Sequence, residues 1–188
     1  MPQEAANYVC APPLRESWHQ EELWEGLLRG ALQVVSTDHC PFDVASRRAG
    51  LDGGGWANFS QIPGGLPGIE TRLALVFQRV IDGEMSPQQW VDRCCTAPAK
   101  LFGLHPAKGE IAPGADADVV VFDPRAERRL LPKNLHMATD HSPYSDIVVR
   151  GWPLLVLLRG REVARNGAPV GRAGWGRYIA RGPSGVPA

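Results

Sequence analysis

The chain has 188 residues, 44% of them hydrophobic, so it is long enough to bury a sizeable core. Its 20 basic and 20 acidic side chains cancel, which argues against an electrostatic partner such as nucleic acid or a membrane surface. No apolar run approaches the roughly 20 residues that span a bilayer, and the N-terminus lacks a signal-peptide pattern. The four cysteines show no Cys-x-x-Cys spacing, so we expect reduced thiols and a cytoplasmic protein.

The sequence of residues 20–67 predicts a helix, a buried strand and a long irregular loop. Apolar residues on one face and a closing glycine predict a helix over residues 20–30. The apolar run at residues 32–35 predicts a strand buried on both faces, as parallel strands are. Residues 43–67 are rich in Gly and Pro and lack periodicity, so we expect no regular structure there.

Three further helices are predicted before residue 105. Apolar spacing predicts one from about Gly68 to Ile81. Ser86 as N-cap and Pro87 as the first helical residue open the next. A short helix is predicted to begin at residues 96–98 and to run through Leu104.

The remainder predicts short strands joined by tight turns. The predicted strands are residues 119–122, 147–149, 154–158 and 161–164. Arg159-Gly160 and Asn166-Gly167 supply turn residues, and Asn-Gly is a strong hairpin signal. Residues 168–188 lack periodicity, and we expect a largely irregular tail.

The most informative stretch follows the predicted strand directly: residues 36–42 read Ser-Thr-Asp-His-Cys-Pro-Phe. Asp38 therefore stands where a buried strand ends and a loop begins, and catalytic groups of parallel α/β folds gather at that edge. A carboxylate there can bind a cation and also transfer a proton. The alternative interpretation is a structural aspartate that caps the loop.

Four motifs in this order resemble the cyclic amidohydrolases of the dihydropyrimidinase and hydantoinase group. The first is Tyr-Val-Cys-Ala-Pro-Pro-Leu-Arg at residues 8–15, and the second is the Asp38 stretch. The third is Asn-Phe-Ser-Gln-Ile-Pro-Gly-Gly-Leu-Pro-Gly-Ile-Glu-Thr-Arg at residues 58–72. The fourth combines residues 96–104 with residues 108–123. The resemblance covers roughly residues 8–165.

The resemblance implies an α/β fold: the C-terminal fragment of a metal-dependent amidohydrolase TIM barrel, followed by part of a small β-sandwich domain. Residues 1–104 would hold the last barrel strand and the closing helices. Residues 105–167 would belong to the β-sandwich domain, and residues 168–188 would form the irregular tail.

The resemblance also implies a reaction, the opening of a small cyclic amide such as a dihydropyrimidine or hydantoin to an N-carbamoyl amino acid. In the family a hydroxide held between two divalent metal ions, expected to be zinc, attacks the ring carbon. Asp38 would be a metal ligand and the base that passes the proton to the leaving nitrogen. His39 would support Asp38 rather than contact the metal, because neighbouring side chains at a strand end point in opposite directions.

Backbone groups of Gly64 and Gly65 would bind the substrate. The family usually carries an asparagine where this chain has Gly64, but a backbone contact survives the loss of a side chain. A glycine-rich turn that does not contact the substrate is the alternative.

The family's other metal ligands, a His-x-His pair, a carboxylated lysine and two further histidines, are not recognisable here. The five histidines are scattered singly. We therefore expect this chain to be the C-terminal portion of a longer enzyme. This portion alone is expected to bind no metal and to be inactive. The resemblance implies a homotetramer or homodimer for the full-length family enzymes.

Other functions remain open at this point. An allantoinase or a dihydroorotase would be a cyclic amidohydrolase of a neighbouring branch. A non-catalytic scaffold related to the dihydropyrimidinases would belong to a different class of function. The presence of Asp38 favours an enzyme, because a scaffold has no need of that carboxylate.

Overall fold

The structure is a computed structural model that describes residues 2–49 and 60–185. Asn58 and Phe59 of the third motif, and part of the loop predicted at residues 43–67, lie outside the described residues. The chain divides into two compact units. The first comprises residues 1–22, 36–75 and 129–149, and the second comprises residues 23–35, 76–128 and 150–188.

The first unit consists of short helices and loops. Its complete helical elements are α1 (Pro2–Ala5), η1 (Ala6–Tyr8), α3 (Val44–Ala49) and η4 (Pro132–Asn134). The prediction of no regular structure across residues 43–67 is therefore wrong at α3. The Asp43 carboxylate accepts a hydrogen bond of 2.7 Å from the Ser46 backbone N–H, which caps the start of this short helix.

Two helices begin in the first unit and end in the second. They are α2 (Trp18–Arg29) and α4 (Arg72–Ile81), and both confirm predicted helices, with α4 beginning four residues later than expected. Gly30 follows α2 with a positive φ of 84°, the backbone conformation that glycine favours just after a helix.

The predicted strand at residues 32–35 is wrong, because these residues form no strand in the structure. The backbone N–H of Val35 donates instead to the carbonyl of Arg93, at 3.2 Å. An apolar run predicts burial, but a strand also needs a neighbour that completes a ladder of hydrogen bonds.

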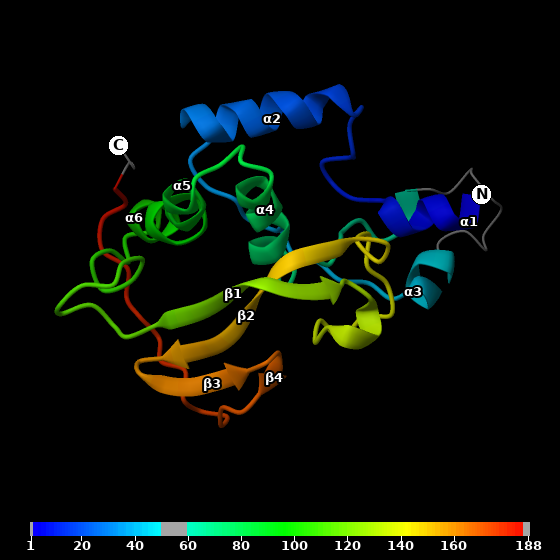
Figure 1. The fold of residues 1–188 in the computed structure, drawn as a ribbon. Helices are drawn as coiled ribbons and strands as arrows, with labels where there is room; N and C mark the ends of the chain where they lie inside the picture. The colour runs from blue at the N-terminus through cyan, green and yellow to red at the C-terminus, as the bar shows by residue number, and fades with distance from the viewer. Residues whose placement is uncertain (1, 50–59, 186–188) are drawn as a thin grey trace. The chain divides into compact units, whose positions relative to one another are not determined.

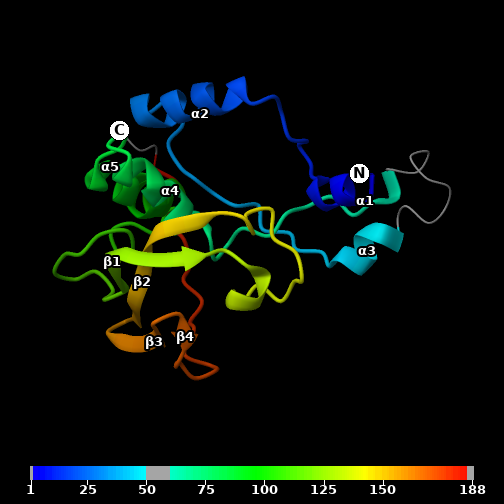
Figure 2. The same cartoon turned by 45° about the vertical axis from the view of Figure 1, so that its right-hand side comes forward.

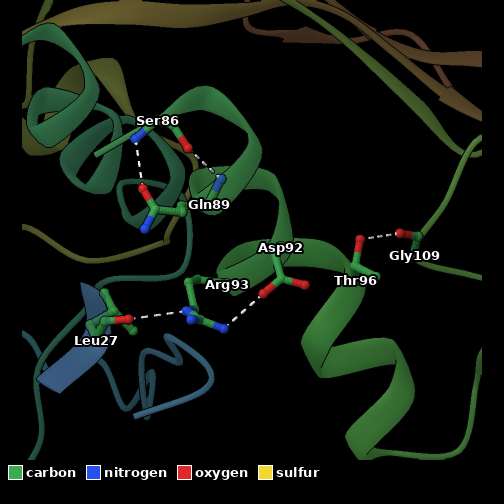
Figure 3. Close-up of polar contacts among 7 residues, drawn as sticks. All are labelled: Leu27, Ser86, Gln89, Asp92, Arg93, Thr96 and Gly109. Atoms are coloured by element: carbon green, nitrogen blue, oxygen red, sulfur yellow. Dashed lines mark hydrogen bonds and ion pairs between the residues drawn. The ribbon is translucent and has the colours of Figure 1, made fainter. Parts of the chain in front are cut away.

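The second unit contains the helices α5 (Pro87–Val91), η3 (Asp92–Thr96) and α6 (Ala97–Leu101) in one continuous helical stretch. Ser86 and Gln89 form the predicted start of α5 as a reciprocal capping box, in which each side chain bonds the other's backbone N–H (Figure 3). The link η3 is one turn of π-helix, which joins two helices that the sequence predicts separately.

The sheet follows, with strands β1 (Val119–Arg129), β2 (Val148–Leu158), β3 (Arg161–Arg165) and β4 (Ala168–Pro169) in the order β1-β2-β3-β4 (Figure 1). β2 pairs antiparallel with β3, and β3 with β4. Both predicted turns are confirmed: Arg159-Gly160 and Asn166-Gly167 take φ values of 47°, 75°, 52° and 83°, as two-residue hairpins of type I′ require.

One long strand, β2, replaces the two short strands predicted at residues 147–149 and 154–158. Gly151 lies inside it with a φ of 104°, and a Cβ there would come within 2.5 Å of the Phe77 ring. Glycine is therefore required at position 151 for Phe77 of α4 to pack this closely on β2.

An aromatic cluster joins helices and sheet in the second unit. Phe77, Trp90 and Phe122 come from α4, α5 and β1, with ring centroids 4.7 to 4.9 Å apart. Figures 1 and 2 show α4 and α5 gathered above the sheet in both views. Offset and edge-on ring pairs of this kind add to the burial of apolar surface.

The irregular tail predicted at residues 168–188 is wrong at its first two residues, which form β4, whereas residues 170–185 are irregular. These residues return to the segment that follows α6, where the Gly182 N–H donates to the Gly103 carbonyl at 2.8 Å. All four cysteines are free. No helix in the described ranges is long and apolar enough to cross a membrane.

Candidate functional site

Asp38 lies in a loop of the first unit, with its side chain exposed. Its φ is 42°, in the left-handed region that residues other than glycine seldom occupy, although aspartate tolerates it better than most. Its carboxylate makes no hydrogen bond or ion pair with any residue that the structure describes. The loop therefore holds a residue in an unfavourable backbone conformation, and its carboxylate is unpaired among the residues that the structure describes.

His39 fastens this loop to the segment that carries Gly64 and Gly65. Its backbone forms an isolated parallel bridge with Leu66, and its ring Nδ1 accepts hydrogen bonds from the Gly68 and Ile69 N–H groups at 3.1 and 3.4 Å. An Nδ1 that accepts carries no proton, so the neutral ring holds its proton on Nε2.

The two glycines have different environments. Gly65 is buried, and its N–H donates to the Val9 carbonyl at 3.0 Å. A Cβ on Gly65 would come within 2.6 Å of the Cys40 carbonyl oxygen, whereas a Cβ on Gly64 would meet nothing nearer than 3.9 Å. Gly64 is exposed beside Cys10 and Ala11, so its peptide groups are accessible in this loop cluster.

Arg47, on α3, is fully buried and bonds the loops around it. Its Nη1 donates to the carbonyls of Ala6, Val9 and Pro63 at 3.1, 3.3 and 3.4 Å, and its Nη2 donates to the Gly65 carbonyl. The guanidinium also lies 5.7 Å from the centre of the Phe42 ring. Burial lowers the pKa of Arg47 from its ordinary value, and negative charge on the Cys10 and Cys40 sulfur atoms would oppose that shift.

The segment around Asp140 supports the same loop from a distant part of the sequence. The Asp140 carboxylate accepts a 2.9 Å hydrogen bond from the Val44 N–H, and the Thr139 hydroxyl donates to the Phe42 carbonyl at 3.2 Å. These two bonds hold Phe42 and Val44, which lie between Asp38 and Arg47 in the sequence.

His141 is a buried titratable group in the same unit. Its ring meets Tyr8 edge-on, with centroids 5.7 Å apart. Burial lowers the pKa of His141, and the positive charge of Arg47 lowers it further, although the Asn7 backbone and Asp140 act in the opposite direction. Tyr144, three residues further along the chain, is half-buried, and this burial raises the pKa of its hydroxyl.

The sequence-predicted residues Asp38, His39, Gly64 and Gly65 all belong to one unit, and hydrogen bonds join the two segments that carry them. Sequence reasoning missed Arg47 and the support from residues 139–141. An arginine inside a Gly- and Pro-rich stretch carries no periodic signal of burial. Residues 140–141 repeat the Asp-His pair of residues 38–39, but so short a repeat does not predict a contact.

The described residues do not by themselves make a metal site. They contain no group of three or more His, Cys, Asp or Glu side chains that could hold a metal ion. One exposed carboxylate is far fewer than the roughly four ligands of a tightly bound zinc.

Comparison with known proteins gives the family. The model of the amidohydrolase family matches residues 6–163, most of the chain. The chain belongs to the amidohydrolase family.

Its relatives in that family include the D-hydantoinase of Streptomyces coelicolor, 45% identical over 95% of this chain and 37% of the relative. A D-phenylhydantoinase of Escherichia coli O81 is 40% identical over 96% of this chain and 39% of the relative. The crystal structure of dihydropyrimidinase from Brevibacillus agri superposes with a TM-score of 0.89 at 44% identity, over 98% of this chain and 39% of that one.

The chain thus spans less than two-fifths of the length of these relatives. Within that span the described structure has the fold of the corresponding part of the hydantoinase structures.

Proposed function

We propose that this chain forms the Asp38-bearing part of an enzyme that opens cyclic amides, a dihydropyrimidine or hydantoin ring, to N-carbamoyl amino acids. The observation that carries the proposal is the exposed Asp38 carboxylate on a strained loop, joined through His39 to the loop that presents Gly64. The relatives named D-hydantoinase and dihydropyrimidinase support this choice of substrate over other cyclic amides.

In this proposal Asp38 is the proton carrier. Its carboxylate accepts a proton from the attacking water and returns it to the ring nitrogen as the carbon–nitrogen bond breaks. Asp38 is also the residue that we propose as a metal ligand, with zinc as the expected metal and the remaining ligands supplied outside the described residues. His39 keeps the loop in place.

Gly64 is the proposed substrate contact. A cyclic imide presents C=O acceptors next to an N–H donor, and one exposed peptide segment offers the complementary N–H and C=O. The Gly65 N–H and C=O both bond within the chain, so the role of Gly65 is to hold this segment while Gly64 contacts the ring.

The proposal extends to the architecture. Residues 1–104 would complete the end of a TIM barrel, residues 105–167 would contribute to a β-sandwich domain, and residues 168–188 would follow as a tail. The full-length enzyme would act as a homodimer or homotetramer.

The test is a chimera in which these 188 residues replace the matching segment of the Streptomyces coelicolor D-hydantoinase. We expect the chimera to hydrolyse hydantoin or dihydrouracil well above a metal-only blank, and the isolated chain to stay at the blank. A chimera that folds and assembles like its parent but turns over neither ring would refute the proposed function.

A further inference from the structure

We propose that Arg47 is the positioning residue of the substrate loop: it fixes the directions in which Gly64 presents its N–H and C=O to the ring. The inference rests on the proposed function, because it assigns a role within the same site. It adds a residue on α3, an element that carries neither Asp38 nor the two glycines.

The hydrogen bonds of Arg47 converge from separate stretches of chain. Ala6 and Val9 belong to the N-terminal segment, and Pro63 and Gly65 flank Gly64. Val9 also accepts the N–H of Gly65, so the two segments are bonded to each other as well as to the guanidinium. Arg47 thus closes a network rather than making an isolated contact.

The network determines the two peptide planes on either side of Gly64. A peptide unit is planar, so the Pro63 carbonyl and the Gly64 N–H share one plane, and the Gly64 carbonyl and the Gly65 N–H share the next. Arg47 holds the first plane by binding the Pro63 carbonyl. Val9 holds the second by accepting the Gly65 N–H, and Arg47 binds Val9 in turn.

The chemistry of the cluster requires an arginine. Within the part of the chain that the structure describes, Arg47 pairs with no carboxylate, and four carbonyl oxygens and the Phe42 ring surround its buried charge instead. A planar guanidinium can donate to several acceptors in fixed directions, whereas a lysine ammonium is a compact charge on a flexible stem. Lysine would keep the charge and lose the geometry.

The first measurement uses the chimera with Arg47→Lys and, as a matched control, Arg48→Lys at the exposed neighbouring position on the same helix. Asp38 is intact in both variants, so the chemical step should be preserved, and only Arg47→Lys should weaken binding of the ring. We expect Arg47→Lys to raise KM by about 10-fold with kcat within about 3-fold, and Arg48→Lys to change neither. An unchanged KM, or a fall in kcat alone, would overturn the positioning role.

The second measurement does not depend on activity. Hydrogen exchange of the 188-residue chain should rise by about 10-fold in peptides covering residues 6–9 and 63–66 for Arg47→Lys, and not for Arg48→Lys. A uniform rise over the whole chain would mean a general loss of stability and would contradict a local role. A wild-type chimera without turnover would refute the proposed function, while exchange would still decide whether Arg47 holds the loop.

Discussion

Adjacent glycines have different tasks in the loop beside Asp38. Gly65 is buried against the Cys40 backbone and bonded through both of its peptide groups, whereas Gly64 is exposed. One glycine is therefore needed for close approach of two backbones, and the other for access to solvent.

Substituting each glycine in turn separates these tasks. Gly65→Ala would place a Cβ within 2.6 Å of the Cys40 carbonyl, so the loop must shift, and we expect a lower thermal midpoint of the chimera and at least about 100-fold less activity. Gly64→Ala meets nothing nearer than 3.9 Å and should keep the wild-type midpoint. Equal midpoints for the two variants would show that the close packing of Gly65 is not required.

The buried His141 predicts a dependence of stability on pH. Its pKa in the folded protein is lowered, so below the ordinary value of 6.5 the unfolded chain binds the proton more readily than the folded one. The stability from the neutral ring is complete above that pH and is lost as the pH falls through the folded pKa. We expect the thermal midpoint to fall between pH 7.5 and pH 5, and less so for His141→Gln.

His19→Gln is the control for His141→Gln, because the His19 ring stacks on Trp18 and makes no contact with Arg47 or Tyr8 that the structure records. If His141→Gln and His19→Gln retain the same slope of midpoint against pH as the wild type, another group controls the acid sensitivity.

At the residue scale the sequence supplied the candidate Asp38 but not the residues that hold its loop in place. Asp38 is a candidate from the sequence because its motif is contiguous and follows an apolar run. Arg47 is not, because its burial depends on carbonyls contributed by residues 6–9 and 63–65, and such convergence is a property of the folded chain alone.

Among the elements, the stretch from α5 to α6 shows how local signals act through polar contacts (Figure 3). Ser86 and Gln89 cap its start, and the Arg93 Nε donates to the Leu27 carbonyl at the end of α2, at 3.1 Å. The Thr96 hydroxyl donates to the Gly109 carbonyl at 2.6 Å. The contacts of Arg93 and Thr96 tie the helical stretch to other parts of the second unit.

Removing the cap gives a test at this scale. Ser86→Ala leaves the Gln89 N–H without its 3.1 Å bond, and we expect a loss of about 1 kcal/mol in the free energy of unfolding. Gln88→Ala, at an exposed position of the same helix, should be neutral within about 0.5 kcal/mol. A Ser86→Ala loss no greater than that of Gln88→Ala would remove the capping box from the stability of α5.

Elements with local signals were predicted well, and elements that need distant partners were not. The hairpin turns at Arg159-Gly160 and Asn166-Gly167 follow from residue types that tolerate positive φ. The strand predicted at residues 32–35 failed, because pairing depends on a neighbour that an apolar run cannot specify. The π turn η3 between α5 and α6 has no recognised sequence signal.

For the whole molecule, the exposed apolar side chains predict how the isolated chain behaves. The described residues expose Leu14, Trp18, Leu23, Ile69 and Ile111, the last of them by 85%. Exposed apolar surface favours association, because its burial is worth about 25 cal/mol per Å².

We therefore expect the purified chain to self-associate or to bind a hydrophobic dye strongly. The double variant Trp18→Gln with Leu23→Gln should show less self-association and weaker dye binding. Size-exclusion chromatography combined with thermal unfolding provides the measurement. A monodisperse monomer with one cooperative transition would contradict this expectation.

Asp38 is proposed to carry the proton in the hydrolysis of a cyclic amide, and kcat of the chimera with Asp38→Asn measures that role. Asp82→Asn, an exposed carboxylate at the end of α4, is the matched control. Loss of proton transfer should lower kcat by about 10³-fold or more for Asp38→Asn and leave Asp82→Asn unchanged. Turnover by Asp38→Asn within a few-fold of the unmodified chimera would contradict the claim.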